Sequence, residues 1–124
     1  MKIIVVLASL VAAALAIPAD TYDPKYDSFN AAEMASNPRL LRNFGKCFLG
    51  QAPCTAEGNA FNIIIPEALH TNCGKCTRKQ RELVRIIVRA FQKDVPDIWE
   101  QLAKKHDPNG QYKESFNNFL NAKD

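Results

Sequence analysis

The stretch CFLGQAPCTAEGNAFNIIIPEALHTNCGKC, residues 47–76, contains all four cysteines of the chain in the spacing C-x6-C-x18-C-x2-C. An even number of cysteines behind an apolar N-terminal segment is typical of disulfide bonds in a secreted protein. Four cysteines allow three pairings. The short separations of Cys47 from Cys54 and of Cys73 from Cys76 suggest bridges that brace local turns.

The N-terminal segment has the features of a secretion signal. Met1 and Lys2 precede an apolar run at residues 3–15, and the small residues Ala14 and Ala16 occupy the two positions that a signal peptidase reads. The run is shorter than the roughly 20 residues that span a bilayer. We therefore expect a signal peptide at residues 1–16 and a single small secreted domain at residues 17–124.

Helix signals lie on the N-terminal side of the cysteines. The polar lead that ends at Asp27 is expected to be extended, and a first short helix is expected around Phe29 and Met34. Asn37 and Pro38 indicate the start of a second helix, because asparagine caps free backbone N–H groups and proline is tolerated in the first turn.

The segment between the two cysteine pairs is also predicted to be helical. Thr55 can cap this helix, and apolar residues recur from Phe61 to Leu69 at helical spacings. Proline disfavours helical geometry in the residue before it. A break or kink is therefore expected at Ile65 and Pro66.

The longest helix is expected to follow the last cysteine. Residues 77–80, TRKQ, form a capping box, and the wide apolar face from Leu83 to Phe91 predicts a central, buried helix. Pro96 begins a further helix, the turn at residues 107–110 ends it, and a last amphipathic helix is expected at residues 112–120. The predicted fold class is all-α, with about six short helices and no convincing sheet.

The long helix carries cations on its other side, which we call the basic stripe. Its members recur every three or four residues and are Arg78, Arg81, Arg85, Arg89 and Lys93. A solvated face is the plainer interpretation. The alternative is docking to an anionic membrane or receptor, whereas a net charge of only +3 and the lack of a recognisable nucleic-acid motif argue against nucleic acid.

The cysteines also fit two kinds of chemistry. Cys73 and Cys76 have the spacing of half a zinc site, which His70 or the other cysteine pair could complete. The same C-x-x-C pattern, placed before a capped helix, occurs in thiol–disulfide oxidoreductases. The signal peptide argues against a zinc site, because cysteines of secreted proteins are usually oxidised to disulfides. The absence of a predicted βαβ unit, which normally presents a redox C-x-x-C motif, argues against an oxidoreductase. Neither His70 nor His106 lies near a nucleophile motif. We expect no enzymatic activity, metal or cofactor.

Further motifs surround the cysteines between Tyr26 and Phe116. They are Tyr26-Asp27, Asn37-x-Arg39-Leu40-Leu41, Pro53-Cys54-Thr55-x-Glu57-Gly58, Pro66-Glu67-Ala68-Leu69, Cys73-x-Lys75-Cys76-Thr77, Gln80, Trp99 and Asp107-Pro108-x-Gly110-x-Tyr112. With these motifs and its cysteine spacing, the chain resembles the insect chemosensory proteins, an olfactory-segment-D-like family of small secreted carriers.

The resemblance implies a superhelical bundle of six helices around an apolar channel, with disulfides Cys47–Cys54 and Cys73–Cys76. It implies a monomeric carrier in sensillar lymph or haemolymph for long-chain fatty acids, alcohols, esters or pheromone-like semiochemicals. The positions that line or gate the channel in relatives are Tyr26, Asp27, Leu41, Phe44, Ile64, Trp99, Tyr112 and Phe116. The competing interpretation is an interaction or developmental signalling protein that docks through Arg78, Arg81, Arg85 and Arg89.

The chain departs from the family pattern at positions that bear on the channel. Phe44 and His106 replace tyrosines, and Phe61-Asn62 replaces a Leu-Lys pair. We expect a more apolar channel, or one in which Tyr26, Asp27 or Tyr112 contacts the ligand head group instead.

Overall fold

The computed structural model describes residues 21–124, and this part of the chain is helical with no strand. The expected signal peptide at residues 1–16 lies outside the described residues. The elements are η1 (Pro24–Ser28), α2 (Ala31–Ala35), α3 (Pro38–Phe48), α4 (Ala56–Thr71), α5 (Arg78–Asp94), α6 (Pro96–His106) and α7 (Lys113–Asn121). None of these helices combines the length and the apolar character needed to cross a bilayer. The all-α prediction is confirmed.

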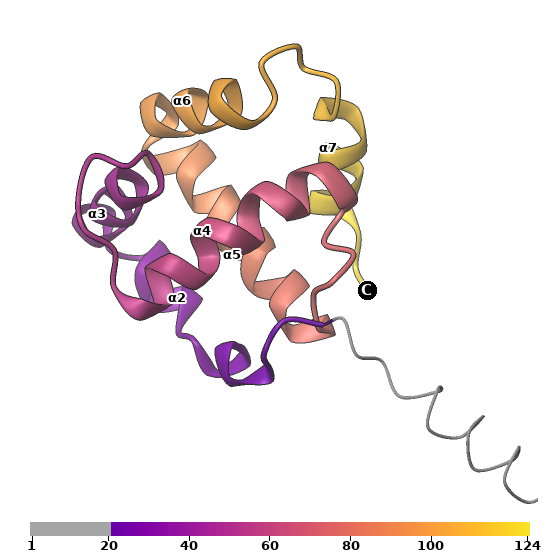
Figure 1. Cartoon of the computed structure of the whole chain (residues 1–124), viewed down its shortest axis with the longest axis horizontal. Helices are drawn as coiled ribbons and strands as arrows, with labels where there is room; N and C mark the ends of the chain where they lie inside the picture. Colours follow the sequence, from indigo (N-terminus) through magenta and orange to yellow (C-terminus); the bar gives the residue numbers. More distant parts are fainter. Residues whose placement is uncertain (1–20) are drawn as a thin grey trace, which may run out of the picture.

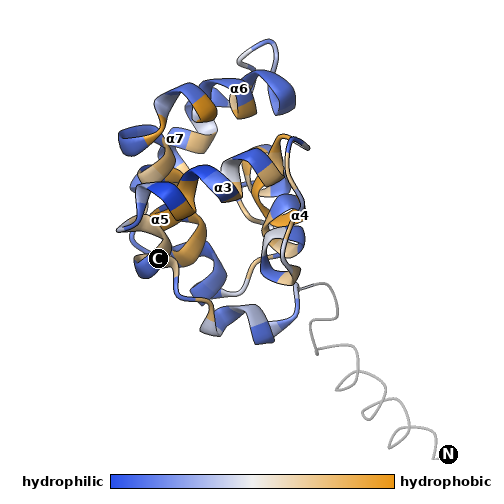
Figure 2. Ribbon diagram, turned by 90° about the vertical axis from the view of Figure 1, so that its left-hand side faces the viewer, coloured by the Kyte–Doolittle hydropathy of each residue, from blue (hydrophilic) through white to orange (hydrophobic). Residues whose placement is uncertain are grey.

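Helix α5 is the centre of the packing. It contacts η1, α2, α3 and α6, and its apolar face from Leu83 to Phe91 is buried, as its sequence pattern predicts. In Figure 1, α4 and α5 cross the middle of the molecule, with α2 and α3 on one side, α7 on the other and α6 along one edge. The apolar parts of the helices are turned towards the middle of the molecule (Figure 2).

The predicted helix starts are confirmed by side-chain caps. The side chains of Asn37, Thr55 and Thr77 each accept a hydrogen bond from the backbone N–H three residues later. The capping box is complete, because Gln80 Oε1 also accepts from the Thr77 N–H at 3.0 Å. Each cap pairs a backbone donor that a free helix end would leave unsatisfied.

Two local predictions were wrong. The lead up to Asp27 is not fully extended, because Pro24 begins the 3₁₀ helix η1 and the Asp23 side chain accepts from the Lys25 N–H at 2.9 Å. Proline's fixed φ suits such a first turn. Helix α4 runs through Pro66, so the break, one of the two outcomes expected at Ile65 and Pro66, does not occur. Buried side chains on both sides of this proline, such as Ile64 and Leu69, hold the helix against the core and outweigh the lost hydrogen bond.

The two disulfides are Cys47–Cys54 and Cys73–Cys76, with Cα–Cα distances of 5.1 and 5.2 Å. They lie at the two ends of α4. The first ties the last turn of α3 to the residue before the α4 cap, and the second closes the turn between α4 and α5. The local pairing implied by the resemblance is confirmed.

Helix α3 approaches α5 and α6 closely at Gly45. A β-carbon on Gly45 would lie 2.6 Å from Ile98 Cγ2 and 3.0 Å from Phe91 Cε1. A residue without a side chain is therefore needed at this crossing. Near this close approach Phe48 of α3 lies against α6, where the candidate site lies.

Candidate functional site

An apolar cavity lies between α3, α4 and α6, and we call it the central cavity. Its volume is about 20 Å³, which is room for about one water molecule. Its lining is apolar apart from one asparagine and one histidine, and none of the described residues that line it is charged. The lining residues are Phe48, Phe61, Asn62, Ile65, Pro66, Leu69, Trp99, Leu102, Ala103 and His106.

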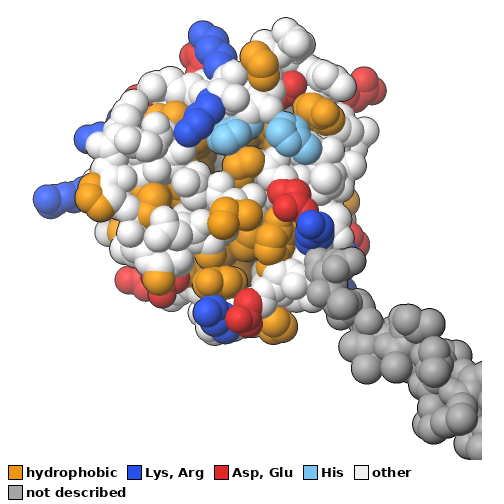
Figure 3. All heavy atoms as spheres, in the orientation of Figure 1, with side chains coloured by type: hydrophobic (Ala, Val, Ile, Leu, Met, Phe, Trp, Pro, Cys, Tyr) orange, Lys and Arg blue, Asp and Glu red, His pale blue; other side chains and the backbone are white. Residues whose placement is uncertain are grey.

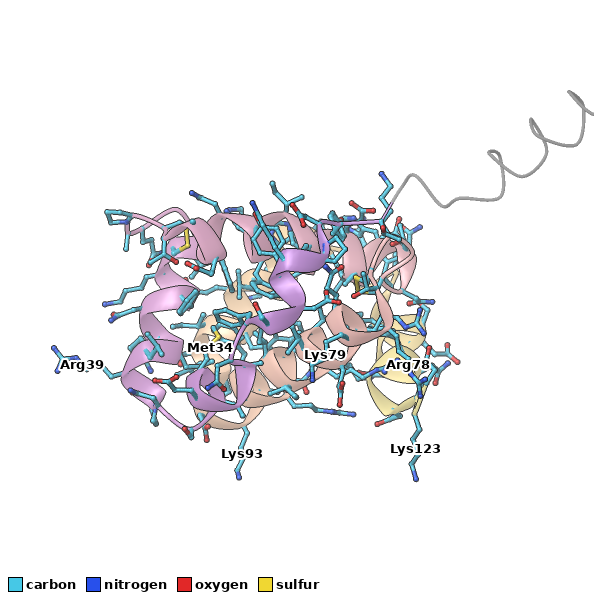
Figure 4. The ribbon with its side chains drawn as sticks, turned by 90° about the horizontal axis from the view of Figure 1, so that it is seen from below. Met34, Arg39, Arg78, Lys79, Lys93 and Lys123 are labelled. Atoms are coloured by element: carbon cyan, nitrogen blue, oxygen red, sulfur yellow. A yellow bond between two sulfur atoms is a disulfide. The ribbon has the colours of Figure 1, made fainter. Side chains whose placement is uncertain are left out.

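A larger hollow, the N-terminal groove, lies between η1, α2, α3 and the start of α4. It has a volume of about 720 Å³, an apolar floor that includes Phe29, Met34 and Phe44, and a polar rim that includes Tyr26 and Glu57. Met34 lies among the helices in Figure 4. The groove is the more open of the two hollows, and its rim can meet polar groups while its floor meets an apolar chain.

Four phenylalanine rings separate the N-terminal groove from the central cavity. Phe29 and Phe44 line the groove, whereas Phe48 and Phe61 line the cavity. The ring centroids of Phe29 and Phe61 are 4.9 Å apart, and those of Phe44 and Phe48 are 6.1 Å apart. We call these four rings the aromatic partition. The groove and the cavity therefore adjoin through a wall of side chains alone.

A third hollow, the C-terminal groove, lies on the other side of the cavity between α5, α6 and α7. Its volume is about 280 Å³, and it shares Leu69, Trp99 and Ala103 with the central cavity. The rings of Trp99 and Phe116 stack across it with centroids 6.2 Å apart. The groove, the cavity and the second groove thus follow one another across the bundle as an interrupted apolar path.

The turn between α6 and α7 positions the C-terminal groove. The carboxylate of Asp107 accepts hydrogen bonds from the backbone N–H groups of Gln111 and Tyr112 at 2.8 and 3.1 Å. Gly110 adopts a φ of +67°, a left-handed conformation that glycine adopts without strain. These features explain why the predicted turn at residues 107–110 brings Phe116 of α7 against Trp99 of α6.

Of the two histidines, His106 lines the central cavity and His70 contacts its backbone. The Nε2 atom of His70 is 2.7 Å from the backbone carbonyl oxygen of His106, and the ring of Tyr112 packs on His70 at 4.7 Å. The histidine side chains lie close together on the face shown in Figure 3. Burial lowers the pKa of the His106 imidazole, and the nearby Lys105 and His70 lower it further. His106 is therefore neutral near pH 7.

The sequence matches a known family over most of its length. A sequence model described as the insect pheromone-binding family A10/OS-D matches residues 22–114. The chain belongs to this family. The match includes all four cysteines and most of the residues that line the three hollows.

The chain is also similar in sequence to individual insect proteins. The chain is 33% identical over 122 residues to allergen Tha p 1 of Thaumetopoea pityocampa, covering 98% of this chain and 97% of the relative. It is 39% identical over 92 residues to the putative odorant-binding protein A10 of Drosophila melanogaster, covering 74% of this chain and 59% of that protein. Family membership thus rests on similarity along nearly the whole chain.

Solved structures of the family have the same fold. A chemosensory protein in complex with bromo-dodecanol has a TM-score of 0.70 and 28% identity, over 79% of this chain and 98% of that one. The antennal chemosensory protein A6 of the moth Mamestra brassicae has a TM-score of 0.67 and 28% identity, over 80% and 92% of the two chains. The resemblance to insect chemosensory proteins is therefore confirmed.

The structure distributes the family's channel positions over different environments. Tyr26 and Phe44 line the N-terminal groove, and Trp99 and Phe116 line the C-terminal groove. The remaining four lie elsewhere. Leu41 and Ile64 are buried in the core, Asp27 accepts a hydrogen bond from Thr77 Oγ1, and Tyr112 packs against His70. None of these four lines the three hollows.

Of the residues that line the central cavity, Trp99 was predicted as a channel position and Phe61, Asn62 and His106 as departures that bear on the channel, but the others were not singled out as site residues. Phe61, Ile65 and Leu69 lie at i, i+4 and i+8 on α4, so they share one side of that helix. On α6 the lining residues also share one side of the helix, at i, i+3, i+4 and i+7, and they are Trp99, Leu102, Ala103 and His106. These spacings were visible in the sequence, but which side of each helix faces a hollow depends on how the helices pack.

The basic stripe is partly occupied by the C-terminal residues of the chain. Arg81 and Arg85 form ion pairs with Asp124, and the Arg85 Nε–H donates to the Phe119 carbonyl at 2.9 Å. The Arg85 guanidinium also lies 4.5 Å from the centroid of the Phe119 ring. In contrast, Lys93 extends away from the helices (Figure 4). The middle of the stripe therefore holds α7 and the residues after it.

Proposed function

We propose that this protein is a secreted carrier of small hydrophobic ligands with a long alkyl chain, such as fatty alcohols, esters or acids. The observation that carries the proposal is the apolar path from groove to cavity to groove through the bundle. Family membership supports it, as does the bromo-dodecanol complex of a similar chemosensory protein. The apolar N-terminal segment, residues 1–16, supports secretion.

Burial of an alkyl chain can supply the affinity. Each buried methylene contributes about 0.8 kcal/mol, so fifteen contribute about 12 kcal/mol. Association costs about 4 kcal/mol at the low end of the estimates. The remaining 8 kcal/mol or so corresponds to micromolar binding. We therefore expect affinity to rise with chain length.

A guest of this size needs the side chains around the path to move. The central cavity holds about 20 Å³, so a bound chain must displace rings of the aromatic partition or widen the gap between α4 and α6. Both disulfides lie at the ends of α4, and neither links to α6 or α7. In our proposal α6 and α7 shift to admit the ligand, because they are held to α4 by side-chain packing and the His70–His106 hydrogen bond rather than by a disulfide.

Filling the path should abolish most of the binding. Ala103→Phe places a ring where the central cavity meets the C-terminal groove, and we expect affinities for C12 to C18 ligands to fall by about tenfold or more. Displacement of a fluorescent probe measures this, and quenching of Trp99, the single tryptophan of the chain, gives a second reading.

Ala32→Phe on α2 is the matched control, because Ala32 is exposed and lines none of the three hollows. It should bind like the wild type, and circular dichroism should show that both variants are folded. If acids, alcohols and esters of every length fail to displace the probe from the wild-type protein, the carrier proposal is wrong.

The competing redox function is less well supported. Cys73 and Cys76 form a disulfide and are only 2% and 7% exposed. A catalytic C-x-x-C needs an accessible sulfur that a substrate thiol can reach. We therefore propose a structural role for this disulfide and a non-enzymatic function for the protein.

Docking through the basic stripe is also less well supported, because its central arginines already bind within the chain. We expect Arg85→Glu to release α7 and the residues after it, since it removes the contacts to Phe119 and Asp124 and adds a repelling charge. Amide hydrogen exchange of residues 116–124 should then be faster. Arg78→Glu, at an exposed position of the same stripe, should leave their exchange unchanged. Equal exchange in both variants would contradict this role of Arg85.

A further inference from the structure

The Nε2 atom of His106 is a buried polar atom in an apolar cavity. It is shielded from solvent, and it has no hydrogen-bond partner among residues 21–124. His106 is the last residue of α6, and it lines the central cavity with Trp99 and Leu102 of the same helix. Buried polar atoms are almost always paired, so an unpaired one at a ligand cavity points to a partner supplied by the ligand.

The backbone of α4 has an unusual hydrogen-bonding pattern beside the cavity. Asn62 and Pro66 both line the cavity. In an uninterrupted helix the Asn62 carbonyl would accept from the N–H of residue 66, but proline has none. That carbonyl therefore lacks its usual helical partner.

The groups around His106 keep its imidazole neutral. Lys105 is its neighbour on α6, and His70 of α4 contacts its backbone carbonyl. Tyr112 packs on His70, and the carboxylate of Asp107 is engaged by the backbone N–H groups of the following turn. Burial, Lys105 and His70 lower the pKa of His106. A neutral imidazole nitrogen either donates or accepts, depending on its tautomer, and a hydroxyl group satisfies both cases.

We propose that the central cavity selects alkyl chains with an uncharged hydroxyl head group, such as fatty alcohols, through a hydrogen bond to His106 Nε2. This inference rests on the proposed carrier function and names the ligand class of the same site. A carboxylate is disfavoured because none of the described lining residues carries a charge, and the nearby Lys105 ammonium already donates to the Phe48 carbonyl at 3.2 Å. His106 is thus a specificity-determining residue.

The test compares three ligands of equal chain length, which are 1-dodecanol, 1-chlorododecane and dodecanoate, by probe displacement at pH 7.5. We expect the wild-type protein to bind dodecanol about five- to tenfold more tightly than chlorododecane, and dodecanoate more weakly than dodecanol by about tenfold or more. His106→Phe should remove the preference for dodecanol over chlorododecane and retain the affinity for chlorododecane.

Two further variants separate head-group recognition from a general effect on the fold. His106→Gln keeps a donor and an acceptor, so it should restore part of the preference for dodecanol. Gln101→Phe puts the same phenyl ring on an exposed position of α6 and should leave the preference unchanged. The ratio of two affinities within one variant does not change when a substitution only loosens the fold.

The outcomes distinguish this inference from the carrier function. If the wild-type protein binds dodecanol and chlorododecane equally, or if His106→Phe keeps the preference, the role of His106 is wrong while the carrier function stands. Equal binding of dodecanoate and dodecanol contradicts the selection against charge. If none of the three ligands binds, the carrier function fails and this inference fails with it.

Discussion

Phe91→Ala should lower the free energy of unfolding by about 3 to 5 kcal/mol, the usual cost of removing a buried phenylalanine. Phe91 is 1% exposed on the central helix α5. Its ring packs against Phe48 with centroids 5.9 Å apart, and a β-carbon on Gly45 would lie 3.0 Å from it. Helices α3, α5 and α6 meet at this ring, so they cannot close the space that alanine would leave without moving apart.

Chemical denaturation with linear extrapolation measures this loss. Lys93→Ala, two residues further along α5 and extending away from the helices in Figure 4, is the control and should change stability by less than about 0.5 kcal/mol. Domains of this size have total stabilities of about 5 to 15 kcal/mol, so Phe91→Ala removes a large fraction. A loss below about 1 kcal/mol would show that the core collapses around the smaller residue.

Gln80→Ala should cost about 2 to 4 kcal/mol, because it leaves two partly buried backbone groups without partners. Gln80 is fully buried. Its Oε1 atom accepts from the Thr77 N–H at 3.0 Å, and its Nε2 donates to the Asp23 carbonyl at 2.9 Å. The first hydrogen bond completes the cap of α5. The second fixes the segment that leads into η1, whose residue Tyr26 lines the N-terminal groove.

The effect of Gln80→Ala should extend to the segment that it fixes. We expect faster amide exchange at residues 22–29 as well as a lower unfolding midpoint. Gln80→Glu separates the two hydrogen bonds, since it keeps the acceptor for Thr77 but sets a carboxylate oxygen against the carbonyl of Asp23. Lys79→Ala, at the exposed neighbouring position, serves as the control. Unchanged exchange in Gln80→Ala would mean that other contacts suffice to hold η1.

The helices could be predicted because their signals are local. Capping residues such as Asn37 and Thr77 act within three residues along the chain, and amphipathic spacing reports which side of a helix is buried. The two errors have different causes, since η1 follows from the local cap of Asp23 and Pro24, whereas at Pro66 tertiary packing competes with a local rule. Buried side chains around Pro66 keep α4 continuous, although proline alone predicts a break.

The site was less predictable, because its hollows depend on distances between helices. Family positions identified Tyr26 and Trp99, which line grooves, but they also pointed to Leu41, which is fully buried in the core. The central cavity, at about 20 Å³, is smaller than most side chains, and amino-acid composition cannot reveal a space of that size. Likewise, the ion pair between Arg85 and Asp124 joins residues 39 positions apart, so the stripe alone could not show it.

The disulfide at the N-terminal end of α4 also determines what happens when the backbone is cut. Gly50 and Gln51 are exposed in the turn that Cys47 and Cys54 enclose, so a protease can reach that turn. A single cut there leaves both fragments joined by the sulfur–sulfur bond, and they separate only under reducing conditions. The nicked chain therefore remains one covalent molecule, which would suit the secretion that we propose.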